Sequence, residues 1–170
     1  SDCLVAVDAH TGEYIWHYQL IHHTLWNYDP PAAPILLDVT IDGEPRKIVV
    51  QVTKQSYAYV FDRITGEPIW PIEERPAPAS DVEGEVTSPT QPHPTRPAPY
   101  DRQGFTVDDL IDFTPELREQ ALQELGDRRT GPLYTPPSLG GSVQMPGELG
   151  GADWVGGAVD PTTGVLFIGS

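Results

Sequence analysis

The sequence repeats one short pattern three times, and this repetition limits the fold more than any other feature. Each copy has a short apolar strand, an Asp, two further residues, Thr-Gly and a second apolar strand; the copies occupy residues 6–16, 59–70 and 158–168. Because Asp can bond the turn backbone and Gly accepts a positive φ, each copy predicts a β-hairpin. Trp16 and Trp70 stand four residues after the Gly, where a flat ring can seal one sheet against the next, whereas the third copy has Ile168. The pattern predicts an all-β fold of radially repeated sheets.

The stretch between the first two copies predicts one complete sheet. Apolar runs at residues 35–41 and 47–52 flank Asp42-Gly43, which is typical of a tight hairpin turn. Together with residues 56–61 and the strand after Gly66, they make about four strands. A four-stranded propeller blade needs about this length of chain.

The stretch between the second and third copies is too long for one blade, and we expect residues 71–150 to form a long insertion packed over the propeller within a single domain spanning 1–170. Eight prolines fall between residues 71 and 99, leaving few donors for a sheet ladder and favouring extended or polyproline geometry. Thr114-Pro115-Glu116 then predicts the start of a short helix, and Gly126 predicts its end. Both chain ends fall within strand patterns, so we expect an internal or C-terminal fragment of a longer protein.

Composition excludes several classes of function. A formal net charge of -15 argues against nucleic-acid binding, which needs a basic surface. No stretch approaches the roughly 20 apolar residues of a transmembrane helix. Cys3 is the single cysteine, so neither a Cys-x-x-Cys-His haem site nor a zinc-type Cys cluster is present in the sequence.

Two features carry candidate chemistry. The densest polar and aromatic cluster is residues 22–29, His-His-Thr-Leu-Trp-Asn-Tyr-Asp, in a loop where a propeller places one end of its channel. The His pair at its start is either structural or ligand-binding. Lys54 directly follows the apolar run 48–53, and is either a solvated strand end or a buried cation that needs a partner.

Five segments together resemble the pyrroloquinoline-quinone (PQQ) dependent dehydrogenases, especially the glucose/quinate/shikimate branch: residues 22–34, Lys54, residues 61–76, residues 87–92 and residues 150–154. The resemblance covers nearly the whole chain. It implies about three blades of an eight-bladed β-propeller, with the Trp repeats similar to the family's tryptophan-docking motifs. It also implies an oxidoreductase that oxidises alcohols or sugars by hydride transfer to PQQ.

The resemblance implies roles for three residues at the cofactor. Lys54 matches the basic residue that contacts the quinone carbonyls, where it polarises the ortho-quinone and stabilises the charge arriving with the hydride. Trp154 matches the aromatic residue beside the cofactor. Asp153 stands where the family usually has Asn, and its added carboxylate should weaken binding of the anionic cofactor unless it is protonated or paired.

The main departure from the family is Asn27, which stands where many members have the Asp that removes the substrate hydroxyl proton. An amide cannot take that proton. Asp29 lies two residues on and, in an extended segment, points to the same side. Either Asp29 or a group outside these residues is the base, or catalysis is impaired. The family also needs Ca²⁺ or another divalent ion; Asn27 can offer it one oxygen, with most ligands outside this chain.

We therefore expect an enzyme of periplasmic type that passes electrons to a quinone or cytochrome acceptor. A segment outside this chain could attach it to the inner membrane. The fragment by itself is expected to be inactive. Two alternatives remain open: a non-catalytic propeller scaffold and a pseudoenzyme that binds quinone without turnover. A scaffold has no reason to keep Lys54 or the loop at residues 22–29.

Overall fold

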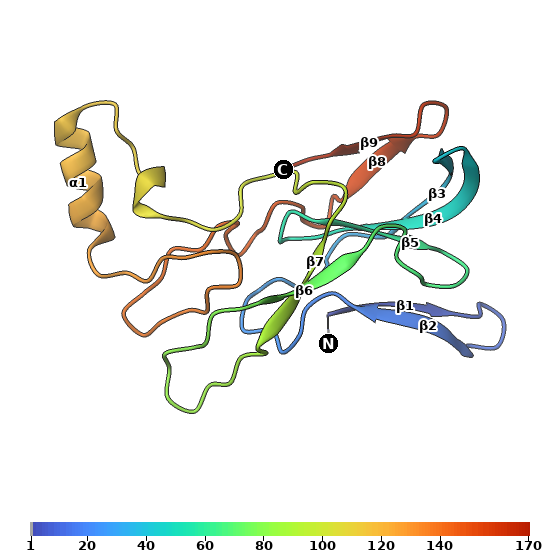
Figure 1. Ribbon diagram of the computed structural model, residues 1–170, viewed down its shortest axis with the longest axis horizontal. Helices are drawn as coiled ribbons and strands as arrows, with labels where there is room; N and C mark the ends of the chain where they lie inside the picture. The colour runs from blue at the N-terminus through green and yellow to red at the C-terminus, as the bar shows by residue number, and fades with distance from the viewer. Residues whose placement is uncertain (1) are drawn as a thin grey trace.

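A computed structural model describes residues 2–170 and contains four small antiparallel sheets and one α-helix (Figure 1). The elements in chain order are β1 (Cys3–Val7), β2 (Tyr14–Gln19), β3 (Ile35–Ile41), β4 (Glu44–Val52), β5 (Ala58–Asp62), β6 (Ile72–Pro76), β7 (Thr90–Pro94), the 3-10 turn η1 (Val107–Asp109), α1 (Pro115–Leu125), β8 (Gly157–Asp160) and β9 (Val165–Ile168). None of the helices in this described stretch has the length and apolar character needed to cross a membrane.

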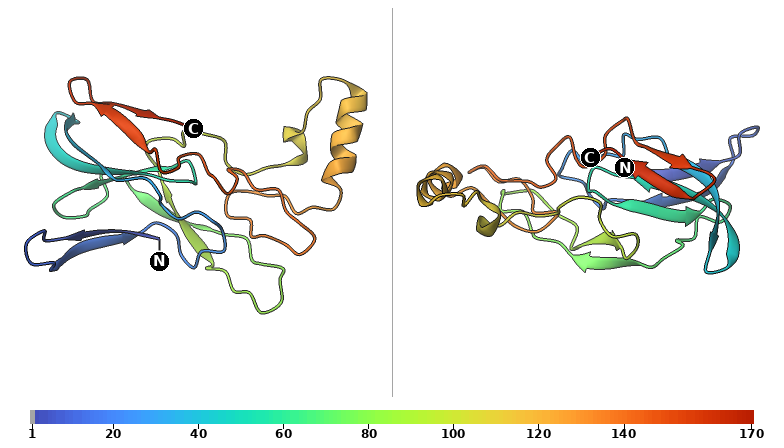
Figure 2. Two further views of the ribbon diagram at one scale, coloured as in Figure 1. Left: turned by 180° about the vertical axis from the view of Figure 1, so that it is seen from behind. Right: turned by 90° about the horizontal axis from the view of Figure 1, so that it is seen from above.

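The central sheet, β3-β4-β5, lies between the β1–β2 hairpin on one face and the β8–β9 hairpin on the other (Figures 1 and 2). Alternation along β4 explains this, because Val49 joins the core shared with β1–β2 while Val50 joins the core shared with β8–β9. Their partners across the strand pair, Phe61 and Val60, enter the same two cores. Each fully buried side chain of this kind stabilises the fold by about 1.5–3 kcal/mol. The stacking of three successive sheets confirms the expectation of a partial propeller.

The three repeated turns have the same geometry. In each, the Gly N–H donates to the Asp backbone carbonyl at 2.8 Å: Gly12 to Asp8, Gly66 to Asp62 and Gly164 to Asp160. Each Asp carboxylate also accepts backbone N–H bonds from the turn, and these bonds lower the pKa of all three carboxyl groups. The role assigned to Asp and Gly in the repeat is therefore confirmed.

Trp70 packs against the core shared by the central sheet and β8–β9, and the sealing contact takes its expected form, with the ring on the next hairpin, at Trp16. Its ring packs flat on Gly66 of the next hairpin, where an added Cβ would lie 2.6 Å from the ring, and its indole N–H donates to the Arg63 carbonyl at 3.3 Å. Trp70 does not lie on Gly164 in the same way, since the atom nearest to a Cβ built there is a methyl of Val39. The reason is that the third hairpin packs on the face of the central sheet nearest to β3, whereas Trp70 follows β5 at the other edge of that sheet.

The proline-rich segment contains a sheet that its composition argued against: β6 pairs with β7 over five residues of each strand. The prolines fit because they occupy alternate positions. The Ala77 N–H donates to the Pro89 carbonyl at 2.9 Å, which places the hydrogen-bonded pairs at odd residue numbers on both strands. The strand prolines lie at the intervening positions, where the backbone nitrogen faces away from the partner strand: Pro76, Pro92 and Pro94.

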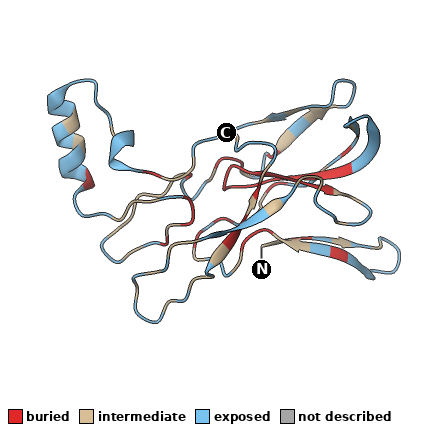
Figure 3. Ribbon diagram, viewed as in Figure 1, coloured by how far each residue is buried: buried red, intermediate tan, exposed pale blue. Residues whose placement is uncertain are grey.

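Helix α1 begins and ends as predicted. Thr114 accepts a hydrogen bond from the Leu117 N–H at 3.3 Å, and Gly126 ends the helix with a φ of 54°. The helix stands away from the sheets and is mostly exposed, with Leu125 as its buried residue (Figures 1 and 3). The helix therefore does not pack over the sheets described here, and the expectation that the insertion packs over the propeller stays a prediction for this part of it. Other parts do pack there, because Leu133 and Tyr134 belong to the core beside β1–β2.

Candidate functional site

The loop after β2 presents aromatic and polar side chains on opposite sides. Trp26 and Tyr28 are buried, and Asn27 and Asp29 are exposed. The Trp26 indole N–H donates to the Thr135 carbonyl at 2.9 Å, which anchors the buried side of the loop to the insertion. An extended segment turns alternate side chains to opposite sides, so the two polar groups emerge together.

Lys54 lies in the tight turn between β4 and β5, and every residue from Thr53 to Ser56 is buried. The turn closes through the Ser56 N–H, which donates to the Thr53 carbonyl at 3.1 Å. Ser56 has a φ of 68°, in the left-handed region that disfavours residues with a Cβ. The turn is therefore held by its surroundings rather than by local preference.

The Lys54 ammonium contacts both exposed groups of the loop. Its Nζ donates to Asp29 Oδ1 at 2.8 Å and to Asn27 Oδ1 at 3.3 Å. The Lys54 side chain is 8% exposed and that of Asp29 is 53% exposed, so a buried cation forms the floor beneath an accessible carboxylate. The interpretation of Lys54 as a solvated strand end is wrong, and the expectation that Asn27 and Asp29 point to the same side is confirmed.

Two consecutive glycines, at the end of the insertion and directly after it, lie against the Lys54 turn. Gly150 has a φ of +76°, and a Cβ there would lie 2.3 Å from the Lys54 Cβ and 2.5 Å from its Cα. A Cβ on Gly151 would lie 2.1 Å from Ser56 Oγ, and the Gly151 N–H donates to the Lys54 carbonyl at 2.9 Å. The Gly-Gly pair thus fixes the position of Lys54, because no side chain fits between the two segments.

We expect Gly150→Ala to lower the free energy of unfolding of the full-length protein by about 2–4 kcal/mol, since it adds both overpacking against backbone and an unfavourable φ. Gly147→Ala is the matched control, because a Cβ there meets nothing within 4 Å. Chemical denaturation of both variants checks this prediction. Equal stability of the two variants would contradict the close approach of Gly150 to Lys54.

Asp153 and Trp154 follow these glycines but do not join the Lys54 contacts. Trp154 is 76% exposed. The Asp153 carboxylate accepts the Trp154 N–H at 2.8 Å, and no Lys or Arg of residues 2–170 forms an ion pair with it. The structure therefore brings Asn27, Asp29 and Lys54 together. Asp153 and Trp154 lie outside this group, on the segment that follows Gly150-Gly151.

His22 has structural contacts. Its Nε2 lies 3.0 Å from Glu74 Oε1 and its Nδ1 lies 2.9 Å from Gln19 Oε1. Its backbone is held by Gln91, whose amide accepts from the His22 N–H at 2.9 Å and donates to the His22 carbonyl at 2.7 Å. These bonds tie the loop to β6 and β7, which favours the structural interpretation for His22.

Two residues that the sequence did not single out, Tyr57 and His93, support the site from behind. Tyr57 and His93 form a hydrogen bond of 2.6 Å, and the ring of His93 packs edge-on against Tyr134. The one available signal was the order Gln91-Pro92-His93-Pro94, in which polar residues alternate with prolines as in a strand. As for metal ions, the described stretch contains no group of three or more His, Cys, Asp or Glu side chains that could hold one.

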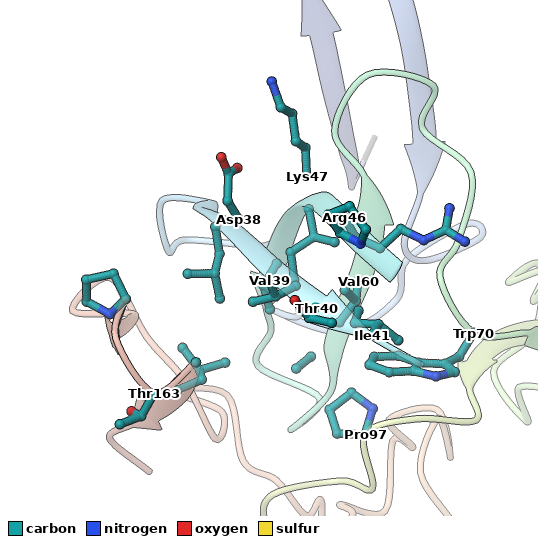
Figure 4. Close-up of a pocket in the computed structure, with 18 of the residues that line it drawn as sticks. Asp38, Val39, Thr40, Ile41, Arg46, Lys47, Val60, Trp70, Pro97 and Thr163 are labelled. Atoms are coloured by element: carbon teal, nitrogen blue, oxygen red, sulfur yellow. The ribbon is translucent and has the colours of Figure 1, made fainter. Parts of the chain in front are cut away.

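A separate cleft of about 960 Å³ lies between the central sheet and the β8–β9 turn (Figure 4). It is lined by apolar side chains of β3, β4 and β5 and by polar ones such as Asp38, Arg46 and Lys47. Trp70 and Pro97 lie on one side and Thr163 on the other. None of Asn27, Asp29 and Lys54 lines it. We interpret it as the seam between neighbouring sheets rather than as the reaction site.

Comparison with known families gives a match over residues 1–170 to the family described as "PQQ: Glucose/ethanol/alcohol dehydrogenase, beta-propeller domain". The chain is 40% identical over 172 residues to the quinoprotein glucose dehydrogenase of Gluconobacter oxydans, covering 96% of this chain and 20% of that protein. It is 35% identical over 166 residues to the quinate/shikimate dehydrogenase (quinone) of Acinetobacter baylyi, covering 97% of this chain and 20% of that protein.

Among solved structures, a quinohemoprotein alcohol dehydrogenase of Pseudomonas putida matches with a TM-score of 0.54 and 27% identity, covering 98% of this chain and 19% of that one. The chain thus spans about a fifth of the length of the relatives it matches.

Proposed function

The chain belongs to the PQQ glucose/ethanol/alcohol dehydrogenase β-propeller family, and we propose that it supplies part of the reaction site of an enzyme that oxidises alcohols or sugars with pyrroloquinoline quinone. Residues 1–170 would contribute about three of eight blades, with residues 71–150 as an insertion within them. The observation that carries the proposal is the Lys54 ammonium, which is buried beneath the exposed Asp29 carboxylate at 2.8 Å.

The residues present fit an anionic quinone cofactor. An ammonium has three donors, and Lys54 uses two of them on Asn27 and Asp29, so one proton is left for a carbonyl oxygen. Trp154 offers an exposed flat ring on the segment that follows Gly150-Gly151. When bound, pyrroloquinoline quinone supplies the two-electron acceptor for alcohol oxidation. Lys54 would hold it and stabilise the negative charge that develops on it.

Asp29 is the proposed general base. Its carboxylate can accept the hydroxyl proton of a substrate, whereas the amide of Asn27 cannot. Asp29 is 53% exposed on its side chain, so a substrate can reach it without displacing protein. The bond to Lys54 orients the carboxylate, and Asn27 accepts a second hydrogen bond from the ammonium.

Asn27 is also the proposed contributor of one metal ligand. The amide oxygen of Asn27 has two lone pairs, so it can bind Ca²⁺ or a similar hard cation while it accepts from Lys54. The other ligands would come from residues outside this chain. By analogy with the family, we place the enzyme in the periplasm, with a quinone or cytochrome as the electron acceptor.

Reconstitution tests the proposal. The full-length protein is incubated with pyrroloquinoline quinone and Ca²⁺, and dye reduction is measured with a panel of alcohols, polyols and sugars. Substrate-dependent reduction that requires the quinone is the expected result. Quinone binding without turnover would instead identify a pseudoenzyme, and the absence of both would identify a scaffold.

A further inference from the structure

The turn that carries Lys54 has an unfavourable backbone conformation and unpaired buried polar atoms. Contacts with other segments must therefore stabilise it. Ser56 has a φ of 68°, and within residues 2–170 the buried Gln55 Oε1 and Ser56 Oγ have no hydrogen-bond partner. Both features disfavour this conformation. Tyr57 closes the turn, because the Thr53 N–H donates to the Tyr57 carbonyl at 3.0 Å.

Tyr57 is in turn fixed by a side chain of the insertion. Its hydroxyl oxygen and His93 Nδ1 form a hydrogen bond of 2.6 Å, and the two rings meet edge to face at 5.7 Å. Tyr57 is 3% exposed, so burial shields its hydroxyl from solvent and makes the bond to His93 costly to lose. His93 lies on β7, opposite Glu73 of β6.

The same group of rings reaches the other half of the site. The ring of Tyr134 packs edge-on against His93 and against Trp26, with centroid separations of 5.4 Å in both cases. Trp26 immediately precedes Asn27 in the loop. The four rings of Tyr57, His93, Tyr134 and Trp26, which we call the aromatic bracket, thus connect the Lys54 turn to the Asn27–Asp29 loop.

We propose that His93 is a positioning residue, which holds Lys54 at its place in the cofactor site through Tyr57 and the aromatic bracket. The proposal rests on the function proposed above for Lys54 and Asp29. His93 acts through the position of Tyr57 and touches neither Lys54 nor Asp29. The proline-rich segment thereby gains a role in the site, because it supplies His93, the hydrogen-bond acceptor for the Tyr57 hydroxyl.

The charge state of His93 suits this role. Burial, with a smaller contribution from Arg75, lowers the pKa of His93 to about 4, while Glu74 and Glu73 act in the opposite direction. The rings that face it, Tyr57 and Tyr134, have raised pKa values and are neutral. A neutral imidazole can accept the Tyr57 proton at Nδ1, whereas the imidazolium cannot.

A pH dependence follows from this shift. Between pH 6.5 and about 4 the unfolded chain protonates His93 and the folded chain does not, so the folded state loses stability as the pH falls through this window. His93→Asn keeps an acceptor oxygen near the Nδ1 position and does not titrate. We expect the denaturant concentration at the midpoint of unfolding to fall less between pH 7 and pH 5 in His93→Asn than in the wild-type full-length protein. Chemical denaturation of both proteins at the two pH values measures this.

The positioning role is tested by fluorescence titration of the apo full-length protein with pyrroloquinoline quinone in the presence of Ca²⁺, at pH 7. We expect His93→Phe and Tyr57→Phe to bind the quinone about tenfold more weakly, because each removes the Tyr57–His93 hydrogen bond, which fixes the residue that closes the turn. His93→Asn should bind within about threefold of the wild type, since the acceptor is restored. Tyr57→Phe keeps the buried ring, so it provides a folded variant if His93→Phe does not fold.

The outcomes separate this proposal from the function on which it rests. Wild-type affinity in both His93→Phe and Tyr57→Phe would overturn the positioning role while leaving quinone binding intact. Equal losses in His93→Asn and His93→Phe would also overturn it, because a hydrogen-bond acceptor would then not be what matters. A wild-type protein that binds no quinone would overturn the proposed function itself.

Discussion

Asp29→Asn should lower kcat of the reconstituted full-length enzyme by about 100- to 10,000-fold, the contribution that a positioned general base makes. The substitution keeps the size of the side chain and can keep its bond to Lys54, which now spans 2.8 Å, but it removes the group that accepts a proton. Steady-state dye reduction at saturating alcohol or sugar measures the effect. Quinone affinity, measured in parallel, should change much less than kcat.

Two companion variants make the assignment of the base specific. Asp38→Asn is the matched control, because Asp38 pairs with Arg63 on the surface and its loss should leave kcat unchanged. Asn27→Asp/Asp29→Asn moves the carboxylate to the other oxygen position on Lys54, and we expect it to recover part of the lost activity. Full activity of Asp29→Asn would show that the base lies outside these residues.

Lys54→Met should lower kcat/KM by about 100- to 1,000-fold, as removal of one preorganised donor to a developing negative charge does in other enzymes. Met retains the apolar stem that fills the turn and loses only the ammonium. Asp29 then loses its partner, but its side chain is 53% exposed and water can solvate it, so folding should survive. Kinetics and quinone titration on the same preparation measure the loss.

The chain offers a matched control for this variant as well. The sequence contains two lysines, and Lys47 is exposed on β4 where Lys54 is buried. Lys47→Met should therefore leave kcat/KM and quinone affinity unchanged. If the two variants behave alike, the buried ammonium has no special role in the reaction.

Local features of the sequence predicted the parts of the fold that local interactions decide. The Asp and Gly of each repeated turn act within a few residues of one another, so the three hairpin turns and the Asp42-Gly43 turn follow from the sequence. Thr114 and Gly126 likewise mark the ends of α1. The stacked order of the sheets followed from their repetition.

Contacts between distant segments explain what the sequence did not predict. Prolines are compatible with β7 because each one takes a position whose backbone nitrogen makes no hydrogen bond to the partner strand. The number of prolines does not tell which of the alternate strand positions they occupy. Trp16 lies on Gly66, but Trp70 does not lie on Gly164, and this difference depends on where the third hairpin packs on the face of the central sheet.

The site likewise has features that local sequence predicted and contacts that it did not. The alternation at residues 26–29 placed Asn27 and Asp29 on one side, and Lys54 stood out because it interrupts an apolar run. Nothing local to Lys54 shows that Gly150 closes over it, or that Tyr57 finds its acceptor in His93. These contacts join segments far apart in the chain, and only the folded arrangement reveals them.

The most direct test of this account is an experimental structure of the full-length protein with pyrroloquinoline quinone bound. We expect the Lys54 Nζ to lie within hydrogen-bonding distance of a quinone carbonyl oxygen, with Asp29 beside it and the three sheets in successive positions around the propeller axis. A quinone bound elsewhere, with the Lys54 ammonium turned into bulk water, would contradict it.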